Sequence, residues 1–233
     1  MEKVIYALWA DQDRPGFNAA LVKDLAPKLV ALGTEHLRVN VQDDAVSAGS
    51  AMIQQATDPQ FDAVLQFWLP SSNPIFRAPV DDLIAAHCAR FSAWLVTEST
   101  IIPNRLHPPK PKQRTDGFSQ MAFLIKPTRL SWEEWRTFWH MSHTQIAIDT
   151  QANFEYVQNL VVRPLTDNAP PFVGIVEECF PLAALTDPFV FFDAVGDQEK
   201  FDRNLATMME SCDRFIDRGL IDVILTSQYD FGA

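Results

Sequence analysis

The chain has 233 residues, of which 47% are hydrophobic, and its formal net charge is −11. This composition allows a buried core, and the acidic surface excludes nucleic acid as an expected partner because it repels phosphate groups. No apolar run reaches the roughly 18 residues that a spanning helix needs, so we expect no membrane partner and a cytoplasmic protein. Three scattered cysteines fit reduced thiols and predict neither a disulfide framework nor a structural metal site.

Strand-like and helix-like segments alternate through the first half of the chain. Its first segment is an apolar strand, and Pro15-Gly16 then marks a loop before an amphipathic helix. The expected strands cover residues 4–9, 37–41, 61–69 and 95–102, and the expected helices cover residues 17–32 and 80–94. This order, β-α-β-β-α-β, predicts a ferredoxin-like unit over residues 1–103.

Residues 104–117 form a predicted linker between two halves. With Pro103 this stretch contains four prolines, which deny regular structure and favour a stiff connector. It also carries four basic residues in an otherwise acidic protein. The segment is therefore either a solvated linker or an anion-binding loop.

The second half, residues 118–233, repeats the order of the first. The expected strands cover residues 121–126, 154–162, 172–180 and 221–231, and the expected helices cover residues 131–149 and 198–218. A Cys-x-Arg-Phe match at 88–91 and 212–215, placed late in the second helix of each half, supports an internal duplication. Strands that are apolar on both sides indicate two covered sheet faces. We therefore expect an α+β fold in which two ferredoxin-like repeats pair their sheets into a barrel around a hollow centre.

The helix that begins after Ser131 carries the most informative pattern. Ser131 and Glu134 form a capping box, and the apolar positions repeat at helical spacing. One narrow arc of this helix contains Trp132, Trp135, Trp139, His143 and Ile146. Such a stripe predicts either the wall of a cavity for a flat apolar ligand or an aromatic core helix with a hydrogen-bonded histidine.

Several motifs of the second half resemble those of the EthD family in the dimeric α/β-barrel superfamily. The resemblance covers residues 118–231 and rests on Phe123-Leu124-Ile125-Lys126-Pro127, Leu130-Ser131, Glu134-Trp135, Phe138-Trp139, His143 and Tyr156-Val157-Gln158-Asn159. It implies a barrel, usually built from two chains and here fused, that holds a small apolar or aromatic ligand. Relatives of this fold carry out isomerisation, decarboxylation, cofactor-free oxygenation and haem chemistry, so the resemblance implies no single reaction. The first half lacks these motifs, which implies a degenerate site there.

The candidate catalytic residues are His143, Tyr156 and Glu178. We expect His143 to point into the barrel and move a proton, since burial beside indoles keeps an imidazole neutral. His140 lies at the edge of the helix stripe and is a weaker ligand-binding candidate. Tyr156 and Gln158 share one strand face and Asn159 lies on the other, while the neighbours Glu177 and Glu178 also face opposite ways. Which face lines a cavity stays open from the sequence.

The function that these residues predict is cofactor-independent acid–base chemistry of lyase, isomerase or cyclase type. The ligand is expected to be a small hydrophobic, aromatic or polyketide-like carbonyl compound, with the tryptophans, His140, Gln158, Asn159 and Glu177 as further binding residues. The first alternative is a non-catalytic carrier of an apolar metabolite, and the second is a haem-binding protein. No cofactor or metal ion is expected, and association of two chains as a homodimer stays open.

Overall fold

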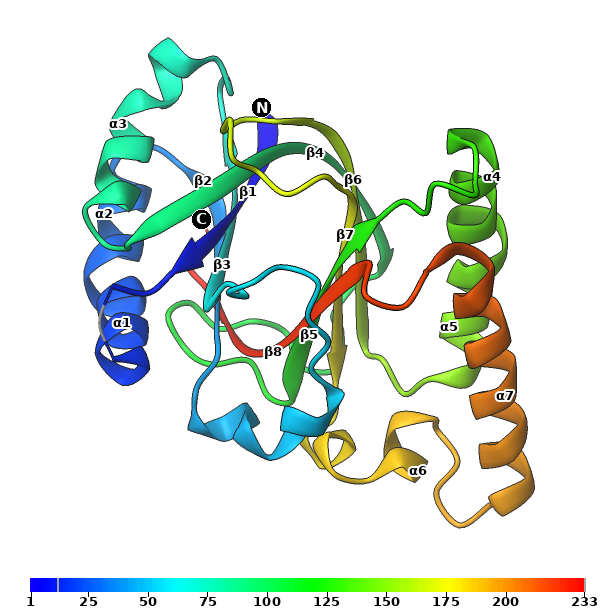
Figure 1. The fold of residues 1–233 in the computed structure, drawn as a ribbon. Helices are drawn as coiled ribbons and strands as arrows, with labels where there is room; N and C mark the ends of the chain where they lie inside the picture. Colours follow the sequence, from blue (N-terminus) through cyan, green and yellow to red (C-terminus); the bar gives the residue numbers. More distant parts are fainter. Residues whose placement is uncertain (12, 233) are drawn as a thin grey trace.

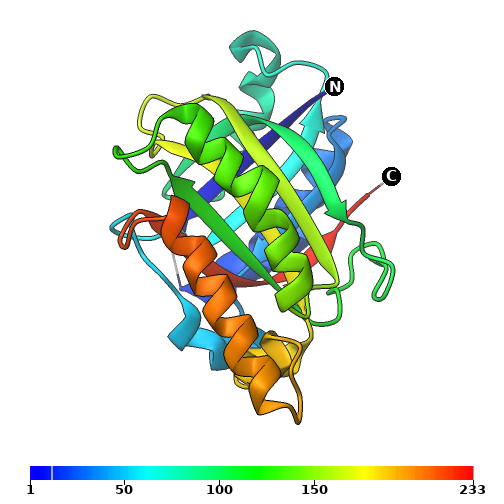
Figure 2. The ribbon, with the colours of Figure 1, turned by 90° about the vertical axis from the view of Figure 1, so that its right-hand side faces the viewer.

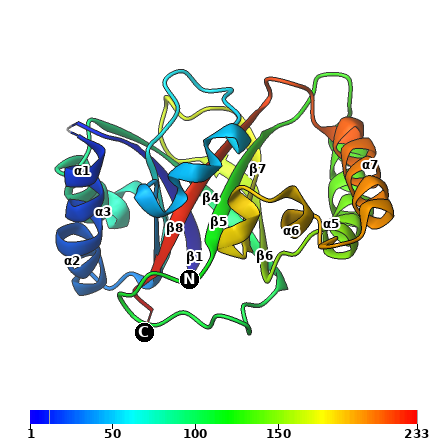
Figure 3. The same ribbon diagram turned by 90° about the horizontal axis from the view of Figure 1, so that it is seen from below.

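The computed structural model describes residues 1–11 and 13–232, whose eight strands form one closed barrel with helices on two opposite sides (Figures 1 and 3). The strands are β1 (Glu2–Trp9), β2 (Glu35–Val41), β3 (Ala63–Leu69), β4 (Arg90–Ile102), β5 (Phe118–Ile125), β6 (Glu155–Pro164), β7 (Phe172–Phe180) and β8 (Ile221–Asp230). Their order around the barrel is β1-β3-β2-β8-β5-β7-β6-β4, with every neighbouring pair antiparallel. The predicted α+β barrel from a single chain is confirmed.

Both halves follow the same path. In the first half the strands lie in the order β4-β1-β3-β2, and in the second half in the order β8-β5-β7-β6. The two sheets join where β2 pairs with β8 and where β4 pairs with β6. This strand order is the one that a ferredoxin-like unit has, and the division of the chain into two such units remains a prediction. Descent from a duplication remains a prediction.

One expected helix and one supporting motif are wrong. The second helix, α3, spans Pro74–Ala85, where Asn73 caps it and Pro74 occupies its first turn. The chain then turns, and β4 begins at Arg90, so Trp94 belongs to a strand. In the first half the Cys-x-Arg-Phe residues lie in a turn and the start of a strand, whereas in the second half they lie at the end of a helix. The match therefore does not mark equivalent positions.

The helices cover the outer faces of the two sheets. The first half carries α1 (Arg14–Ala20), the π-helical segment η1 (Leu21–Leu25), α2 (Ala26–Ala31) and α3. The second carries α4 (Trp132–Arg136), the π-helical segment η3 (Thr137–His143), α5 (Thr144–Thr150) and α7 (Gln198–Phe215). Figure 2 shows α4, α5 and α7 lying across the outer face of the second sheet. Shorter helices connect these layers: η2 (Asp44–Met52), η4 (Leu182–Leu185) and α6 (Pro188–Phe191).

The linker is held along the end of β8. The backbone N–H of Lys112 donates to the carbonyl of Asp230 at 2.7 Å, and that of Thr115 donates to the carbonyl of Gln228 at 2.9 Å. Between them Arg114 forms an isolated bridge with Tyr229. The proline-rich segment therefore has a fixed path at this end rather than a free one.

The barrel interior differs from the expected hollow. Alternate strand residues point inward, and an eight-stranded barrel is narrow enough for side chains to fill it. One part of the interior is packed by a core cluster of apolar residues: Ile5, Ala7, Trp9, Phe61, Val64, Trp94, Val96, Met121, Phe123, Phe172, Ile175 and Ile224. The remaining part is polar and charged. The tryptophan helix does not reach either part, because it lies outside the sheet.

Candidate functional site

The helix with the aromatic stripe begins where the sequence predicts. The Ser131 hydroxyl accepts a hydrogen bond from the backbone N–H of Glu134 at 3.2 Å, and the Glu134 carboxylate accepts one from the backbone N–H of Ser131 at 2.9 Å. This capping box starts α4, which continues through η3 into α5 without a break. π-helical turns inside a helix are frequent at functional sites, and this one ends at His143.

Two of the three tryptophans are buried between the helix and the sheet. Trp135 and Trp139 are fully buried, with their ring centroids 5.0 Å apart. They approach the sheet at Gly174 of β7, where an added Cβ atom would lie 2.7 Å from Cη2 of Trp139. Trp132 stacks on Trp135 at the helix start but remains 43% exposed. The two buried tryptophans are thus part of the core, and of the three tryptophans Trp139 also lines the cavity described next.

A cavity of about 370 Å³ lies between this helix layer and the outer face of the second sheet. The predicted residues that line it are Trp139, His143, Tyr156 and Glu178. Most of its walls are apolar and come from α7, α6 and the strands, and include Leu124, Val176, Phe191, Phe192, Met208, Phe215, Ile216, Ile221 and Val223. A mainly apolar cavity with a few converging polar groups is the usual form of a small-molecule site. We take it as the candidate site.

Glu178 is the acidic group of this cavity. It lies on β7 between Gln120 of β5 and Tyr156 of β6 in the strand register, so three polar side chains form a row on the outer face. Its carboxylate accepts one hydrogen bond, from Nδ2 of Asn153 at 2.8 Å. Burial raises the pKa of Glu178 to about 7. The hydrogen bond from Asn153 lowers the pKa, but it offsets the effect of burial only in part. A carboxyl with this pKa can both release and accept a proton near neutral pH.

His143 faces α7 as well as the cavity. Its Nδ1 lies 3.0 Å from the hydroxyl of Ser211, and its ring lies 4.8 Å from that of Phe215. Burial lowers the pKa of His143 to about 4, so the imidazole is neutral at physiological pH, as expected. The expectation that it points into the barrel is wrong, because the whole helix covers the outer face.

Tyr156 and Gln158 act as a pair on β6. Nε2 of Gln158 donates to the phenolic oxygen of Tyr156 at 2.8 Å and to the hydroxyl of Thr144 at 2.8 Å. The phenol therefore has a fixed orientation, and its own proton is left for donation to a ligand. Burial, with the nearby Glu178 carboxylate, raises the pKa of Tyr156, so it stays protonated.

Asn159 and His140 lie away from this cavity. Asn159 is buried on the inward face of β6 and donates to the carbonyl of Ile175 at 3.2 Å. His140 packs on Trp139 with ring centroids 4.4 Å apart, and its Nε2 is buried without a partner among the described residues. Burial and then Arg136 lower its pKa. Neither residue lines the candidate site.

Glu177 belongs to the polar part of the barrel interior. Its side chain is fully buried and pairs with Arg38 at 2.7 Å. It also accepts hydrogen bonds from Asn40, Gln66, Ser119 and Gln228 at 2.8–2.9 Å. Burial alone would raise the pKa of Glu177, but Arg38 and these donors lower it to about 2. The prediction that Glu177 and Glu178 face opposite ways is confirmed by this placement.

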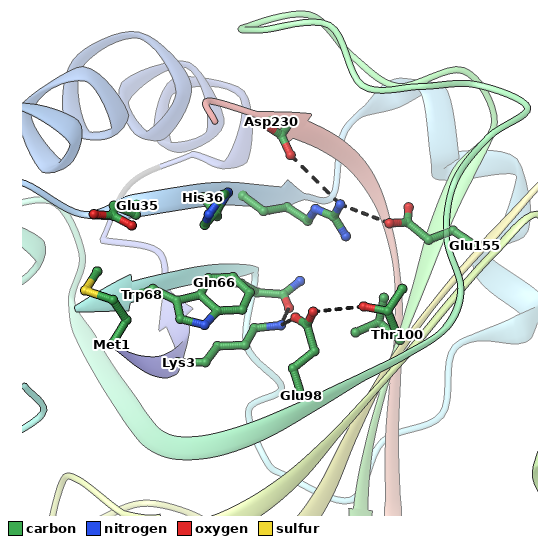
Figure 4. A pocket seen from close by; sticks show the side chains of 12 residues that line it. Met1, Lys3, Glu35, His36, Gln66, Trp68, Glu98, Thr100, Glu155 and Asp230 are labelled. Atoms are coloured by element: carbon green, nitrogen blue, oxygen red, sulfur yellow. Dashed lines mark hydrogen bonds and ion pairs between the residues drawn. The ribbon is translucent and has the colours of Figure 1, made fainter. Parts of the chain in front are cut away.

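The charged network opens at a cavity of about 450 Å³ in the barrel mouth, shown in Figure 4. Arg38 also pairs with Glu155 at 3.0 Å, and Lys3 donates to Gln66 and Glu98. These residues join both halves of the chain, and the sequence analysis missed them. The available signal was a polar residue inside an otherwise apolar strand, as at Lys3 and Gln66.

Comparisons with known proteins agree with this geometry. One crystal structure, of an anthrone oxidase-like protein, has a TM-score of 0.56 and 9% identity, and the match covers 100% of this chain and 94% of that one. Another, described as a candidate chlorite dismutase, has a TM-score of 0.51 and 13% identity, and covers 100% of this chain and 96% of that one. The fold is that of the dimeric α/β-barrel class. Residues 127–219, which lie in the C-terminal half, match the model of the EthD domain. No curated protein sequence matches the chain.

Within residues 1–11 and 13–232, no three His, Cys, Asp or Glu side chains are grouped so that they could hold a metal ion. In the same residues, the helices are all too short or too polar to cross a membrane.

Proposed function

We propose that this protein is a cofactor-independent enzyme, an isomerase or lyase in type, that moves a proton on a small hydrophobic carbonyl compound. The substrate would bind in the cavity between the helix layer and the outer sheet face of the C-terminal half. The observation that carries this proposal is the placement of Glu178. Its carboxyl is buried, faces an apolar cavity and accepts a single hydrogen bond from the described residues, that of Asn153.

The reaction would begin with Glu178 in its ionised form. Its carboxylate takes a proton from a carbon that the substrate carbonyl makes acidic, and the carbon–hydrogen electron pair moves onto the carbonyl oxygen. Return of the proton to another carbon gives an isomerase, and loss of a leaving group gives a lyase. A base with a pKa near the working pH combines availability with driving force.

Tyr156 and His143 would act on the oxygen rather than on the carbon. The Tyr156 hydroxyl is oriented by Gln158, and a phenol in an apolar site is a strong hydrogen-bond donor to a developing oxyanion. The neutral His143 uses Nδ1 for Ser211, which leaves Nε2 for the ligand. The sequence led us to expect that His143 moves the proton. Glu178 takes that role in this proposal, because burial makes the imidazole a weaker base than the carboxylate.

The substrate class is supported by the cavity walls and by one structural neighbour. Aromatic and aliphatic side chains surround the polar row, so the ligand should be flat and largely apolar. The anthrone oxidase-like neighbour is named for an aromatic ketone. An aromatic or polyketide-like ketone is therefore the compound class to test first.

Haem binding, which the fold class also suggests, fits the residues less well. Nε2 of His143 is available as a ligand, but the lining contains Glu178 and Asp213 and only one basic side chain, Arg218. Two haem propionates would meet more negative than positive charge there. The proposal therefore uses no step that involves haem.

Hydrogen–deuterium exchange tests the proposal directly. Anthrone and a panel of small aromatic ketones are incubated in D₂O, and exchange of their acidic C–H groups is followed by NMR. The wild-type protein should accelerate exchange of at least one, with a rate that rises with pH and levels off above about pH 7. Glu178→Gln should lose roughly 100-fold or more, the low end of what a general base contributes.

Glu199→Gln is the matched control, because it removes the same charge from the exposed start of α7. It should exchange like the wild type. Wild-type rates in Glu178→Gln would refute the role of the carboxylate. If the ketones bind saturably but none of them exchanges faster, the proposal of an enzyme would be overturned and the protein would be a carrier instead.

A further inference from the structure

A second, larger cavity lies on the other side of the molecule. It has a volume of about 740 Å³ and lies between the helix α1–η1–α2 and the ends of β2 and β8. None of the residues that line it also lines the candidate active site. It therefore needs an explanation of its own.

The walls of this cavity are mainly apolar. The helix contributes a stripe at helical spacing, with Pro15, Ala19, Val22 and Pro27. The opposite wall consists of Val41 at the end of β2 and of Tyr229 and Phe231 at the end of β8. Two aromatic rings that face an aliphatic helix stripe suit a flat or chain-like apolar group.

The charged residues at this cavity are biased toward the positive sign in an acidic protein. Arg14, Lys23 and Lys112 line it, against Asp43 and Asp44. Arg14 pairs with Asp62 at 2.8 Å, outside the cavity. Lys23 and Lys112 lie on opposite walls, one on the helix and one on the linker, and neither has a carboxylate within 4.0 Å among the described residues.

One of the two acidic groups at the cavity, Asp43, already has hydrogen-bond partners within the protein. The Asp43 carboxylate accepts hydrogen bonds from the Ser227 hydroxyl at 2.8 Å and from the backbone N–H of Ala45 at 3.2 Å. These two donors hold the Asp43 carboxylate toward the end of the barrel. Lys23 and Lys112 are the cationic groups that remain available to a ligand, and Asp44 is an exposed acidic group on the same cavity wall as Asp43.

The linker segment holds Lys112 in a fixed place at the cavity. Its backbone N–H donates to Asp230, and its φ of 63° lies in the left-handed region that a lysine rarely adopts. Residues with such backbone angles persist where the surrounding structure fixes them, and they occur often at ligand clamps. This is the basic segment that the sequence left as either a linker or an anion-binding loop.

One buried polar atom beside the cavity also lacks a partner. Asn18, which is 8% exposed, donates through Nδ2 to the carbonyl of Gln42 at 2.7 Å. Its Oδ1 is buried and has no hydrogen-bond partner in the described part of the chain. An unpaired buried acceptor is costly, and because this atom is covered, a ligand could reach it only if the cavity wall shifted.

We propose that this cavity binds an amphipathic organic anion, an aromatic or aliphatic group that carries a carboxylate or sulfonate. The apolar part lies between the helix stripe and Phe231, and the anionic group lies between Lys23 and Lys112. The site is formed by the N-terminal half, the linker and the end of β8, and it shares no lining residue with the candidate active site, so it does not depend on the chemistry proposed there.

A pair of fluorescent probes separates the charge from the apolar surface. The anion 1-anilinonaphthalene-8-sulfonate and the uncharged N-phenyl-1-naphthylamine share one aromatic skeleton. The anion should bind more tightly, and its affinity should fall as salt is raised. Lys23→Gln and Lys112→Gln should each weaken the anion about two- to fivefold, the range of an exposed ion pair, and leave the uncharged probe unchanged.

Two further variants locate the site. Lys28→Gln removes a charge from an exposed position of the same helix that does not line the cavity, and it should bind like the wild type. Ala19→Trp fills the cavity from an exposed helix position and should remove one equivalent of bound anion. Unchanged anion binding in the double lysine variant, or unchanged stoichiometry in Ala19→Trp, would overturn the proposal. Equal losses of both probes in the lysine variants would also overturn it.

Discussion

Replacing Gly174 by alanine should test how closely the tryptophan helix packs on the sheet. A Cβ atom at this position would lie 2.7 and 2.8 Å from Cη2 and Cζ3 of Trp139, and 3.1 Å from Cη2 of Trp135. Real Cβ contacts are almost never shorter than 3.0 Å, so something must move. Both rings are rigid and fully buried, so the helix itself would have to shift away from β7.

The expected cost follows from two opposing effects. Overpacking of a filled core costs about 1–3 kcal/mol. Replacement of glycine by alanine returns about 0.4–1 kcal/mol by restricting the unfolded chain. The net loss should be about 1–2 kcal/mol. A chain of this size changes its Tm by about 2–4 °C per kcal/mol, so the Tm should fall by about 2–8 °C.

Thermal and urea denaturation measure this loss, and Gly49→Ala is the matched control. A Cβ atom at Gly49 would also be crowded, but by the ends of the flexible side chains of Leu225 and Leu185, which can turn away. It should therefore be less destabilising than Gly174→Ala. Adding Trp139→Phe to Gly174→Ala should recover part of the loss, because the colliding ring atoms are removed. A Gly174→Ala protein as stable as the wild type would refute the reasoning.

Three ionisable groups give further predictions. The pKa of buried Glu178 is raised from 4.5 to about 7, so its contribution to stability is most favourable below pH 4.5 and is lost as the pH rises through 7. Glu178→Gln should therefore be as stable as the wild type at pH 4 and up to about 3 kcal/mol more stable at pH 8. Urea denaturation at the two pH values measures this difference. Glu177 has the opposite sign, with its pKa lowered to about 2, so its contribution to stability is present above pH 4.5 and fades below. Glu177→Gln should lose about 1–3 kcal/mol at pH 7, because Arg38 and the surrounding donors lose a charged acceptor while Arg38 keeps Glu155. For His143, an NMR titration should give a midpoint near pH 4 in the folded protein, and a midpoint near 6.5 would contradict the buried geometry.

The strand order was predictable because each half of the sequence contains one consistent pattern. Strands that are apolar on both sides require two covered faces, and helices can cover only one of them. The face of each sheet that carries no helices is covered when the two sheets pair with each other, and the paired sheets close into a barrel. The boundary error at α3 arose because residues 86–94 contain apolar residues at spacings that fit either a helix end or a strand.

The side of the sheet on which the site lies could not be read from the sequence. Periodicity identifies the face of a helix that is buried, but it does not say which surface that face meets. A helix that follows its own strand packs on the outer face of its own sheet, so Trp139 and His143 could not reach the barrel interior. The alternation along a strand separated Glu177 from Glu178, but only the fold assigns one to the interior and the other to the helix layer.

The two halves share a path but differ in what lies on their outer faces. In the first half one row on the outer face is Tyr6, Leu65 and Val39, and the Tyr6 hydroxyl donates to Asp81 of α3 at 2.7 Å. The polar group there is satisfied by the helix that covers it, and the layer is one apolar core.

In the second half, the equivalent strands carry Gln120, Glu178 and Tyr156, and α7 leaves space over them instead of supplying a partner. A buried carboxyl with space on one side costs stability that an apolar residue would not. The first half shows that the fold does not require this cost. Retention of Glu178 in the second half is therefore best explained by what the carboxyl does to a ligand.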